Sequence, residues 1–527
     1  MDIRSRVALV VLLVSLIPSA WLAWNFRAMP QAGIYHDDVI YFVSAKAVAA
    51  TGYYRIESFP DQPYQTKYPP LYPLLLSFVW RFDPDFPGNL VWVVLLSWLM
   101  LPLFLALAWF HFRLGGFLPV ESWLLCVLLA INPVVVMFST LMMSELLFCV
   151  LLSATILAAE RDQPVRAGFL GGLAFITRTA ALPLLLTVPL VYLFRRRFRE
   201  ASYSFLAMFA WVAGWLLWAH AYRLHSTDPL VLFYTDYLAF YRQDVSLSEI
   251  PALAWDNVGW AVKAIGELFI FDEGTGFLTV TMDRLLTIAA VIGIVRVVRS
   301  GRFTQFTAFG TLYVVQFLVW NYPPNSRFLL PLVPLLYAGL ASEAKHLFEI
   351  IAAAFRKPQL ADRGVAAVIS LLLASVAAYG LYLCYFGSFL FLPQAYRQHQ
   401  FALNGNQDAY SFIKQSVPVD ARVLSYSDPL TYLYTGRRGH SWRFLPGLLR
   451  KGGGDELARE LSRLPEIVRS HQFDYVLYTQ SDFHLDAQEI THPPFRAALD
   501  NRALFEPVFT STHATVFKVV RGTEKLR

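Results

Sequence analysis

The sequence predicts a polytopic α-helical membrane protein with a small α/β domain at its C-terminal end. Hydrophobic residues make up 56% of the chain and charged residues only 16%. Apolar runs recur, and several are long enough to cross a hydrocarbon core of about 30 Å. From residue 392 the composition becomes that of a soluble domain, with the strand-like runs ARVLSYS, FDYVLYT and ATVFKVV. We therefore expect a membrane module at 1–391 and a soluble domain at 392–527.

About eleven membrane spans are predicted. The first is an uncleaved signal anchor, because its apolar run is long for a signal peptide and Trp, Asn and Arg crowd its end. Arginine clusters between later runs mark the cytoplasmic side by the positive-inside rule. The expected spans lie at 7–24, 90–110, 117–137, 145–159, 168–176, 180–194, 203–222, 285–298, 304–320, 328–340 and 365–391. This topology predicts an inner (plasma) membrane protein with its N-terminus in the cytoplasm, and with loop 25–89 and the C-terminal domain outside.

The charge and the cysteines exclude several classes of protein. The net charge of +6 comes mostly from the arginine clusters, which topology explains better than nucleic-acid binding. The three cysteines lie inside apolar segments without ligand spacing, so they are expected to be packed thiols. The sequence has no P-loop, GxSxG or HExxH motif, which disfavours nucleotide hydrolysis and zinc chemistry. His36 beside Asp37 leaves a divalent metal open, although a lone histidine is more often a hydrogen-bonding loop residue.

Three acidic residues are candidates for catalysis. Asp37 and Asp38 are adjacent in a polar stretch at 35–72, just beyond the first apolar run. Ionisable groups near a membrane tend to be functional, and a carboxylate there suits the role of a general base. The alternatives are a solvated loop or an N-cap for a helix at 39–50. Glu145, at the outer end of a predicted span, is the other candidate, and its alternative is a helix-start charge favoured by the macrodipole.

Three cations are predicted at the same outer boundary, namely Lys67, Arg178 and Arg327. Together with the carboxylates they suggest an anionic, membrane-embedded ligand, because arginine binds a phosphodiester through two hydrogen bonds and lysine binds it as a point charge. The alternative for each cation is snorkelling toward lipid headgroups. Tyr-Pro-Pro begins at Tyr68 and again at Tyr322, and the stiff proline pairs would hold the neighbouring cations in place or serve only as loop punctuation.

Five stretches resemble the GT-C superfamily of integral-membrane glycosyltransferases, in particular its bacterial family 39-like branch of protein mannosyltransferase-like and aminoarabinose transferase-like enzymes. They are HDDVIYFVSAKAVAATGYY, QTKYPPLYPLLL, STLMMSELLF, GGLAFITRTAALPLLL and SRFLLPLVPLLY. With the span order and the outer C-terminal domain, the resemblance covers most of the chain. It departs from the family in having no clear set of metal ligands, which puts metal dependence in doubt.

The resemblance implies an inverting transfer of a hexose or pentose from a polyprenyl-phosphate donor to a lipid, glycan or protein acceptor on the outer face. It implies that Asp37 is the base, completed by Asp38, and that Glu145 fills the second acidic position. It places Lys67, Tyr68, Arg178 and Arg327 at the donor phosphate or its cavity, and Tyr322 is expected beside them. The competing hypothesis is a transporter or flippase of a lipid-linked or anionic substrate, for which mid-membrane charges and an internal repeat are expected.

Overall fold

The computed structural model describes residues 3–271, 276–356, 360–442, 446–450, 454–484 and 488–521. The chain divides into two compact units, each assembled from separate segments. The helical unit comprises Met1–Arg27, Val94–Trp215 and Ile250–Gln394. The mixed unit comprises Ala28–Val93, Leu216–Glu249 and Ala395–Arg527. The first loop predicted from the sequence therefore belongs to the same unit as the C-terminal domain.

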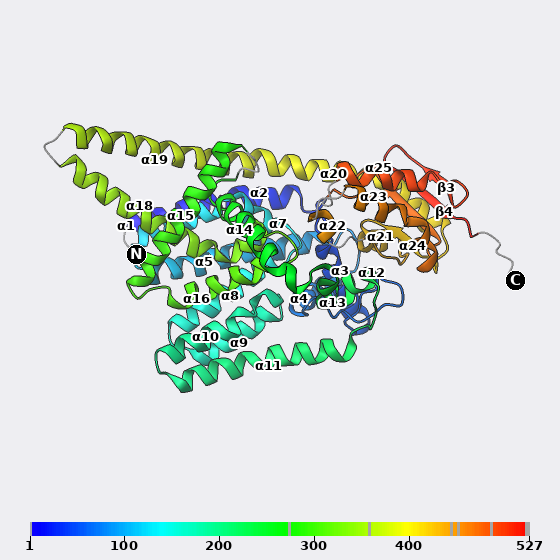
Figure 1. Cartoon of the computed structure of the whole chain (residues 1–527), viewed down its shortest axis with the longest axis horizontal. Coiled ribbons are helices and arrows are strands. Elements are labelled where there is room, and N and C mark those ends of the chain that lie inside the picture. The colour runs from blue at the N-terminus through cyan, green and yellow to red at the C-terminus, as the bar shows by residue number, and fades with distance from the viewer. Residues whose placement is uncertain are drawn as a thin grey trace. The chain divides into compact units, whose positions relative to one another are not determined.

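Five helices among the described residues are long and apolar enough to cross a membrane. They are α5 (Leu90–Leu114), α11 (Phe198–Tyr222), α15 (Phe277–Arg299), the stretch Ser326–Phe355 with α17 (Ser326–Leu329) and α18 (Val333–Phe355), and the stretch Arg363–Ser416 with α19 (Leu360–Phe386) and α20 (Leu392–Ser416) (Figure 1). The pair α6 (Pro119–Ala130) and α7 (Pro133–Thr140) passes the same test but is bent by 62°. The chain is thus an integral membrane protein, while the count of eleven spans stays a prediction.

Shorter helices correspond to the remaining predicted spans. They are α1 (Ile3–Ser15), α2 (Ile17–Asn25), α8 (Glu145–Glu160), α9 (Pro164–Phe175), α10 (Pro183–Phe194) and α16 (Thr304–Leu318). The helical unit also contains α14 (Ile250–Glu267). The run expected to form one helix at 7–24 is divided between α1 and α2. Pro18 lies in the first turn of α2, where its missing N–H and ring end the preceding helix but suit the start of the next.

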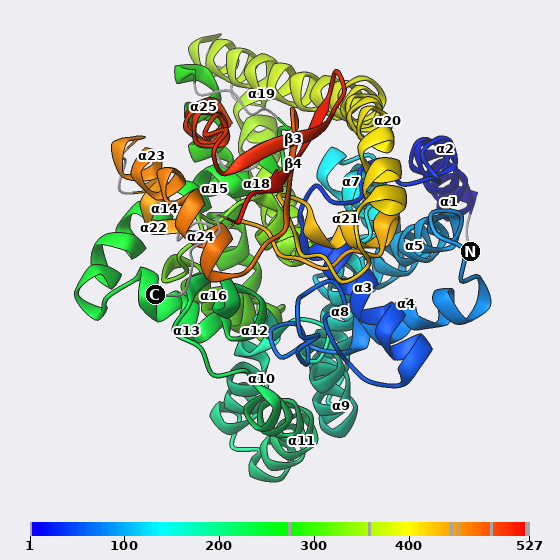
Figure 2. The same cartoon turned by 90° about the vertical axis from the view of Figure 1, so that its right-hand side faces the viewer.

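The mixed unit contains a four-stranded sheet in the order β1-β2-β4-β3. The strands are β1 (Val423–Ser425), β2 (Tyr475–Thr479), β3 (Phe505–Thr510) and β4 (Ala514–Val519). β1 and β2 pair in parallel, and the other pairs are antiparallel; Figure 2 shows β3 and β4 as a red hairpin. Three strands match the predicted runs. β3 was missed because Pro507 interrupts its pattern, which an edge strand with a register shift tolerates.

Helices flank the strands of the mixed unit. They include the end of α20, α23 (Gly454–Ser462) and α24 (Leu464–Ser470). The unit also contains α21 (Asp428–Thr435), α22 (Pro446–Arg450) and α25 (Gln488–Leu499). Its other segments supply α3 (Asp37–Thr51), α4 (Leu71–Phe82), α12 (Pro229–Thr235) and α13 (Tyr237–Asp244). α3 packs on α4, where Trp80 Nε1 donates to the Phe42 carbonyl over 3.0 Å.

A histidine–carboxylate pair ties the segment that carries α12 to the C-terminal domain. His471 Nε2 lies 2.5 Å from Asp228 Oδ2, and Asp228 also caps α12 by accepting from Leu230 N at 2.9 Å. Burial opposes charging of His471, but the hydrogen bond to Asp228 outweighs it and raises the histidine pKa above 6.5. Burial likewise opposes the charge on Asp228, and His471 outweighs it to lower the pKa of that carboxyl.

This pair predicts a pH-dependent stability of the mixed unit. Because the folded pKa of His471 is raised, its stabilisation is complete below the unfolded value of 6.5 and is lost as pH rises through the folded pKa. We expect wild type to lose stability relative to Asp228→Asn as pH rises above about 6.5, because His471 of the variant lacks the charged partner. Thermal unfolding followed by C-terminal-domain fluorescence measures the difference. Parallel pH curves for the two proteins would contradict the prediction.

Candidate active site

Asp37 begins α3, and its carboxylate is hydrogen-bonded to the hydroxyl of Tyr68. His36, the residue before the helix, has a positive φ of 61°, so the chain turns sharply into the first helical turn. The Tyr68 hydroxyl donates to Asp37 Oδ1 in a short hydrogen bond. Asp37 is half-buried. The sequence thus places a carboxylate and a phenol from separate parts of the first loop in direct contact.

The QTKYPP turn that carries Tyr68 is held by its own polar residues. Gln65 Oε1 accepts from the backbone N–H groups of Lys67 and Tyr68, both at 3.1 Å. Thr66 Oγ1 donates to the Thr235 carbonyl at the end of α12 over 2.5 Å. Two prolines follow, and the second, Pro70, is the N-cap residue of α4. Proline is tolerated at the start of a helix but not in its interior.

Asp38 differs from Asp37 in its surroundings. It is buried, with 2% of its surface exposed. Its Oδ2 accepts from Gly33 N and its Oδ1 from Val39 N, each at 2.8 Å, so it fixes the approach of the chain to α3. Gly33 has a φ of +92°, a conformation that favours glycine, and a Cβ there would make a tight contact of 3.0 Å with Ser427 Oγ. The predicted carboxylate pair therefore consists of two groups in distinct environments.

The Lys67 ammonium lies among aromatic rings beside Tyr68. It is 3.6 Å from the ring centroid of Phe233, 4.7 Å from that of Tyr68 and 5.1 Å from that of Tyr237. A cation over the face of an aromatic ring is attracted by the ring quadrupole, and more strongly where water is excluded. α12 and α13 thus position the cation that the sequence predicts.

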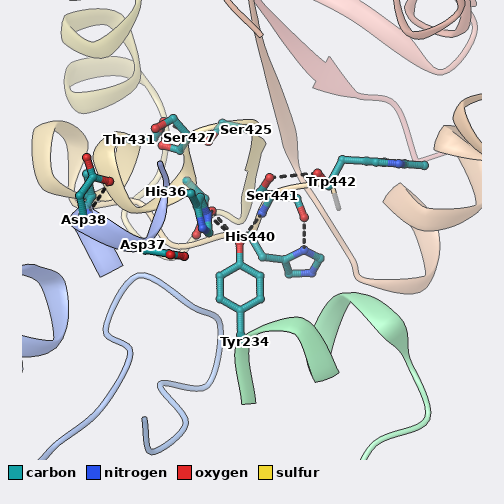
Figure 3. Close-up of polar contacts among 12 residues, drawn as sticks. His36, Asp37, Asp38, Tyr234, Ser425, Ser427, Thr431, His440, Ser441 and Trp442 are labelled. Atoms are coloured by element: carbon teal, nitrogen blue, oxygen red, sulfur yellow. Dashed lines mark hydrogen bonds and ion pairs between the residues drawn. The ribbon is translucent and has the colours of Figure 1, made fainter. Parts of the chain in front are cut away.

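A buried polar network, which the sequence did not predict, adjoins Asp37. His36 Nε2 lies 2.7 Å from Asp428 Oδ1, and the Tyr234 hydroxyl donates to the same oxygen over 2.6 Å. Ser441 N donates to the Tyr234 hydroxyl at 3.0 Å (Figure 3). The four residues come from three separate segments, and His36 and Asp428 are 392 positions apart. No spacing rule reaches that far, and the only signal was a histidine beside Asp37.

Glu145 is the centre of a second cluster, which belongs to the helical unit. It begins α8 and is 2% exposed. Arg178 Nη1 lies 2.9 Å from Glu145 Oε1 and 2.9 Å from Ser144 Oγ. Arg327 Nε donates to the same Glu145 oxygen in a short hydrogen bond. Two cations therefore contact the same oxygen of one buried carboxylate.

Each of the two arginines lies where the helical structure is interrupted. Arg178 lies between α9 and α10, where a short 3-10 turn (Thr179–Ala181) interrupts the helix. Arg327 lies in α17, whose Asn325 cap accepts from Phe328 N at 3.3 Å. Tyr322 is half-buried on the segment that precedes α17.

The predicted site residues thus gather in two groups. One, in the mixed unit, contains Asp37, Asp38, Lys67 and Tyr68, and the other, in the helical unit, contains Glu145, Arg178 and Arg327. Within the described ranges, no three His, Cys, Asp or Glu side chains form a group that could hold a metal ion.

Comparison with known proteins gives structural neighbours only. No family model and no curated protein sequence matches the chain. The chain is similar to ArnT from Cupriavidus metallidurans bound to undecaprenyl phosphate, with 14% identity, a TM-score of 0.50 and 98% of each chain covered. It is similar to the Archaeoglobus fulgidus oligosaccharyltransferase in the apo form, with 13% identity and a TM-score of 0.55, over 98% of this chain and 75% of that one.

A second structure of the archaeal protein, AglB in complex with an inhibitory peptide and a dolichol-phosphate, gives 14% identity and a TM-score of 0.53, again over 98% and 75% of the chains. Identities this low establish the fold and not the substrate. The chain is an integral membrane protein with the fold of these solved structures.

Proposed function

We propose that this protein is an inverting glycosyltransferase that moves a sugar from a polyprenyl-phosphate donor to an acceptor on the outer face of the membrane. The observation that carries the proposal is the half-buried Asp37 carboxylate, held by the Tyr68 hydroxyl next to the Lys67 cation. The proposed displacement removes a proton from a hydroxyl and releases a phosphate. It therefore needs a base for the proton and a cation that stabilises the phosphate. The GT-C neighbours support a lipid-linked donor, since their structures contain undecaprenyl phosphate and dolichol-phosphate.

Asp37 is the proposed general base. One of its oxygens takes the proton of the acceptor hydroxyl while the acceptor oxygen attacks the anomeric carbon. The bond from that carbon to the phosphate oxygen breaks, and polyprenyl phosphate leaves with both electrons of the bond. The Tyr68 hydrogen bond fixes the orientation of the carboxylate. Asp38 is assigned a positioning role, because its two oxygens accept the backbone N–H groups that shape the start of α3.

Two sets of donor-phosphate ligands are proposed, one in each unit. Lys67 with Tyr68 is the set in the mixed unit, and Arg178 and Arg327 with Tyr322 form the set in the helical unit. Arginine matches phosphate geometry with two hydrogen bonds, and lysine contributes a point charge. Glu145 holds both guanidinium groups and is assigned to their positioning. Cations placed before the reaction stabilise the charge that develops on the leaving phosphate, which is usually the largest contribution to catalysis.

The proposal includes the topology predicted from the sequence. The cytoplasmic N-terminus, the extracytoplasmic C-terminal domain at 392–527 and the location in the inner membrane rest on the arginine clusters and the positive-inside rule. In this topology the charged residues of the site lie on the outer side of the membrane, where the lipid-linked sugar is presented.

The experiment is a transfer assay with purified protein in nanodiscs. Donors are polyprenyl phosphates carrying single hexoses or pentoses. Lipids, glycans and peptides are supplied as acceptors, and the readout is release of polyprenyl phosphate. We expect release from at least one donor, unchanged in the control Asp85→Asn, an exposed carboxylate of the same unit. A folded protein that releases none across the panel would overturn the proposal. Movement of an intact lipid-linked sugar across proteoliposomes would then favour the transporter.

A further inference from the structure

A second cationic cluster lies in the mixed unit, apart from the residues assigned above. Lys46 is on α3, and α21 packs against this helix (Figure 2). The Lys46 ammonium lies 4.8 Å from the ring centroid of Tyr432 and 5.7 Å from that of Trp80. Both rings are buried, with 7% and 6% of their surface exposed. The two rings form apolar walls that partly shield the half-buried Lys46 ammonium from water.

A second cation, Arg438, is held next to this lysine by the first loop. Arg438 Nε donates to the Glu57 carbonyl over 3.1 Å, and the Tyr432 hydroxyl donates to Glu57 Oε2 over 3.0 Å. Gly439 N donates to the Ser58 carbonyl over 2.9 Å, and this hydrogen bond fixes the backbone next to Arg438. The cluster is therefore set by contacts from α3, α21 and the loop at 56–59.

The charges of the cluster do not balance. Lys46 and Arg438 contribute two positive charges, and Glu57, which is hydrogen-bonded to Tyr432, contributes one negative charge. In the part of the chain that the structure describes, the Lys46 ammonium has no ion-pair or hydrogen-bond partner, and the Arg438 guanidinium bonds only through Nε. Burial lowers the pKa of Lys46 and the Arg438 charge adds to this, with Glu57 opposing them. An added negative charge would relieve this imbalance.

We propose that Lys46 and Arg438 form an anion-binding subsite that takes a phosphate or carboxylate group carried on the sugar acceptor. This deepens the proposed function, on which it rests, by naming the class of acceptor as an acidic saccharide. Two cations with unused donors against apolar walls bind an anion more strongly than the same groups in water. Lys46 lies on α3, the helix that begins with Asp37, so the subsite and the proposed base share one rigid element.

Equilibrium binding to the full chain in nanodiscs of neutral lipid tests this inference. The probes are glucuronate, glucose 6-phosphate, inorganic phosphate and glucose, measured by calorimetry. We expect the two acidic sugars to bind and glucose not to bind. Lys46→Gln and Arg438→Gln should each weaken the binding by about tenfold or more, the loss expected for a charge-assisted contact. Lys46→Arg, which keeps the charge, should retain most of the affinity.

Matched controls separate this inference from the proposed function. Lys414→Gln removes an exposed lysine of the same unit and should leave binding unchanged. The binding is measured without a donor, so a protein that performs no transfer can still show it. Equal affinity of wild type and the Lys46→Gln/Arg438→Gln double variant would overturn the subsite. Inorganic phosphate binding as tightly as glucose 6-phosphate, or displacement of the acidic sugars by phosphatidylglycerol added to the nanodiscs, would overturn the assignment to an acceptor sugar.

Discussion

Asp37→Asn is expected to lower transfer by about 10²–10⁴-fold, the usual contribution of a well-placed general base. The substitution removes the negative charge and keeps the size of the side chain. Its amide oxygen still accepts from the Tyr68 hydroxyl, so the start of α3 and the QTKYPP turn should keep their arrangement. The loss should appear in the turnover rate, while the affinity for undecaprenyl phosphate and the melting temperature stay close to wild type.

The neighbouring carboxylate supplies the matched control. In Asp38→Asn the amide nitrogen must face one of the two backbone N–H groups that Asp38 now accepts, from Gly33 or Val39. A buried donor left without an acceptor costs about 1–3 kcal/mol, so this variant should lose stability more than chemistry. If Asp37→Asn instead unfolds and Asp38→Asn stays folded without turnover, the roles assigned to the two residues are reversed.

Glu145→Gln is expected to destabilise the helical unit by about 3–5 kcal/mol, the cost of breaking a buried ion pair from one side. The carboxylate is 2% exposed, and the side chains of Arg178 and Arg327 are only 15% and 11% exposed. Its removal leaves two cations close together without the charge that holds them. Thermal unfolding and limited proteolysis in nanodiscs measure the loss, because both follow the population of opened protein.

Two comparisons make the Glu145 result specific. Glu121→Gln breaks an exposed ion pair with Lys345, whose side chain is 49% exposed, and such pairs contribute about 0–1 kcal/mol. Undecaprenyl phosphate should restore part of the stability of Glu145→Gln, because its phosphate replaces the missing negative charge between the arginines. A variant as stable as wild type, or one that the lipid leaves unchanged, would contradict the phosphate site proposed for these arginines.

The helical architecture could be predicted because hydrophobic patterns act locally. A segment such as 90–110 is apolar throughout, and a membrane-spanning chain must satisfy its backbone hydrogen bonds within the helix, so α5 follows from composition alone. The break between α1 and α2 was also encoded, at Pro18, but was overlooked among the apolar residues around it. β3 escaped because its proline masks the strand pattern, and pairing with β4 is a tertiary property.

The candidate site was predictable only in part. Asp37 and Asp38 were selected as charges in a polar stretch just beyond an apolar run, and Glu145 and the cations as charges at the predicted outer boundary. A sequence displays both patterns directly. Their partners were not visible, since the Tyr68 contact to Asp37 and the arginine contacts to Glu145 depend on how loops fold back. The distinction between Asp37 and Asp38 needed the positions of single backbone N–H groups around each carboxylate.

The sequence by itself determined that this is a helical membrane protein with a C-terminal α/β domain and a polar first loop, because composition and periodicity are properties of neighbouring residues. Only the tertiary structure decided that the first loop joins the C-terminal domain in one unit, that His36 meets Asp428, and that Lys46 and Arg438 gather around Glu57 and Tyr432. The reason is physical: charges and hydrogen-bond donors find partners by distance in space, and residues hundreds of positions apart meet only when the chain is folded.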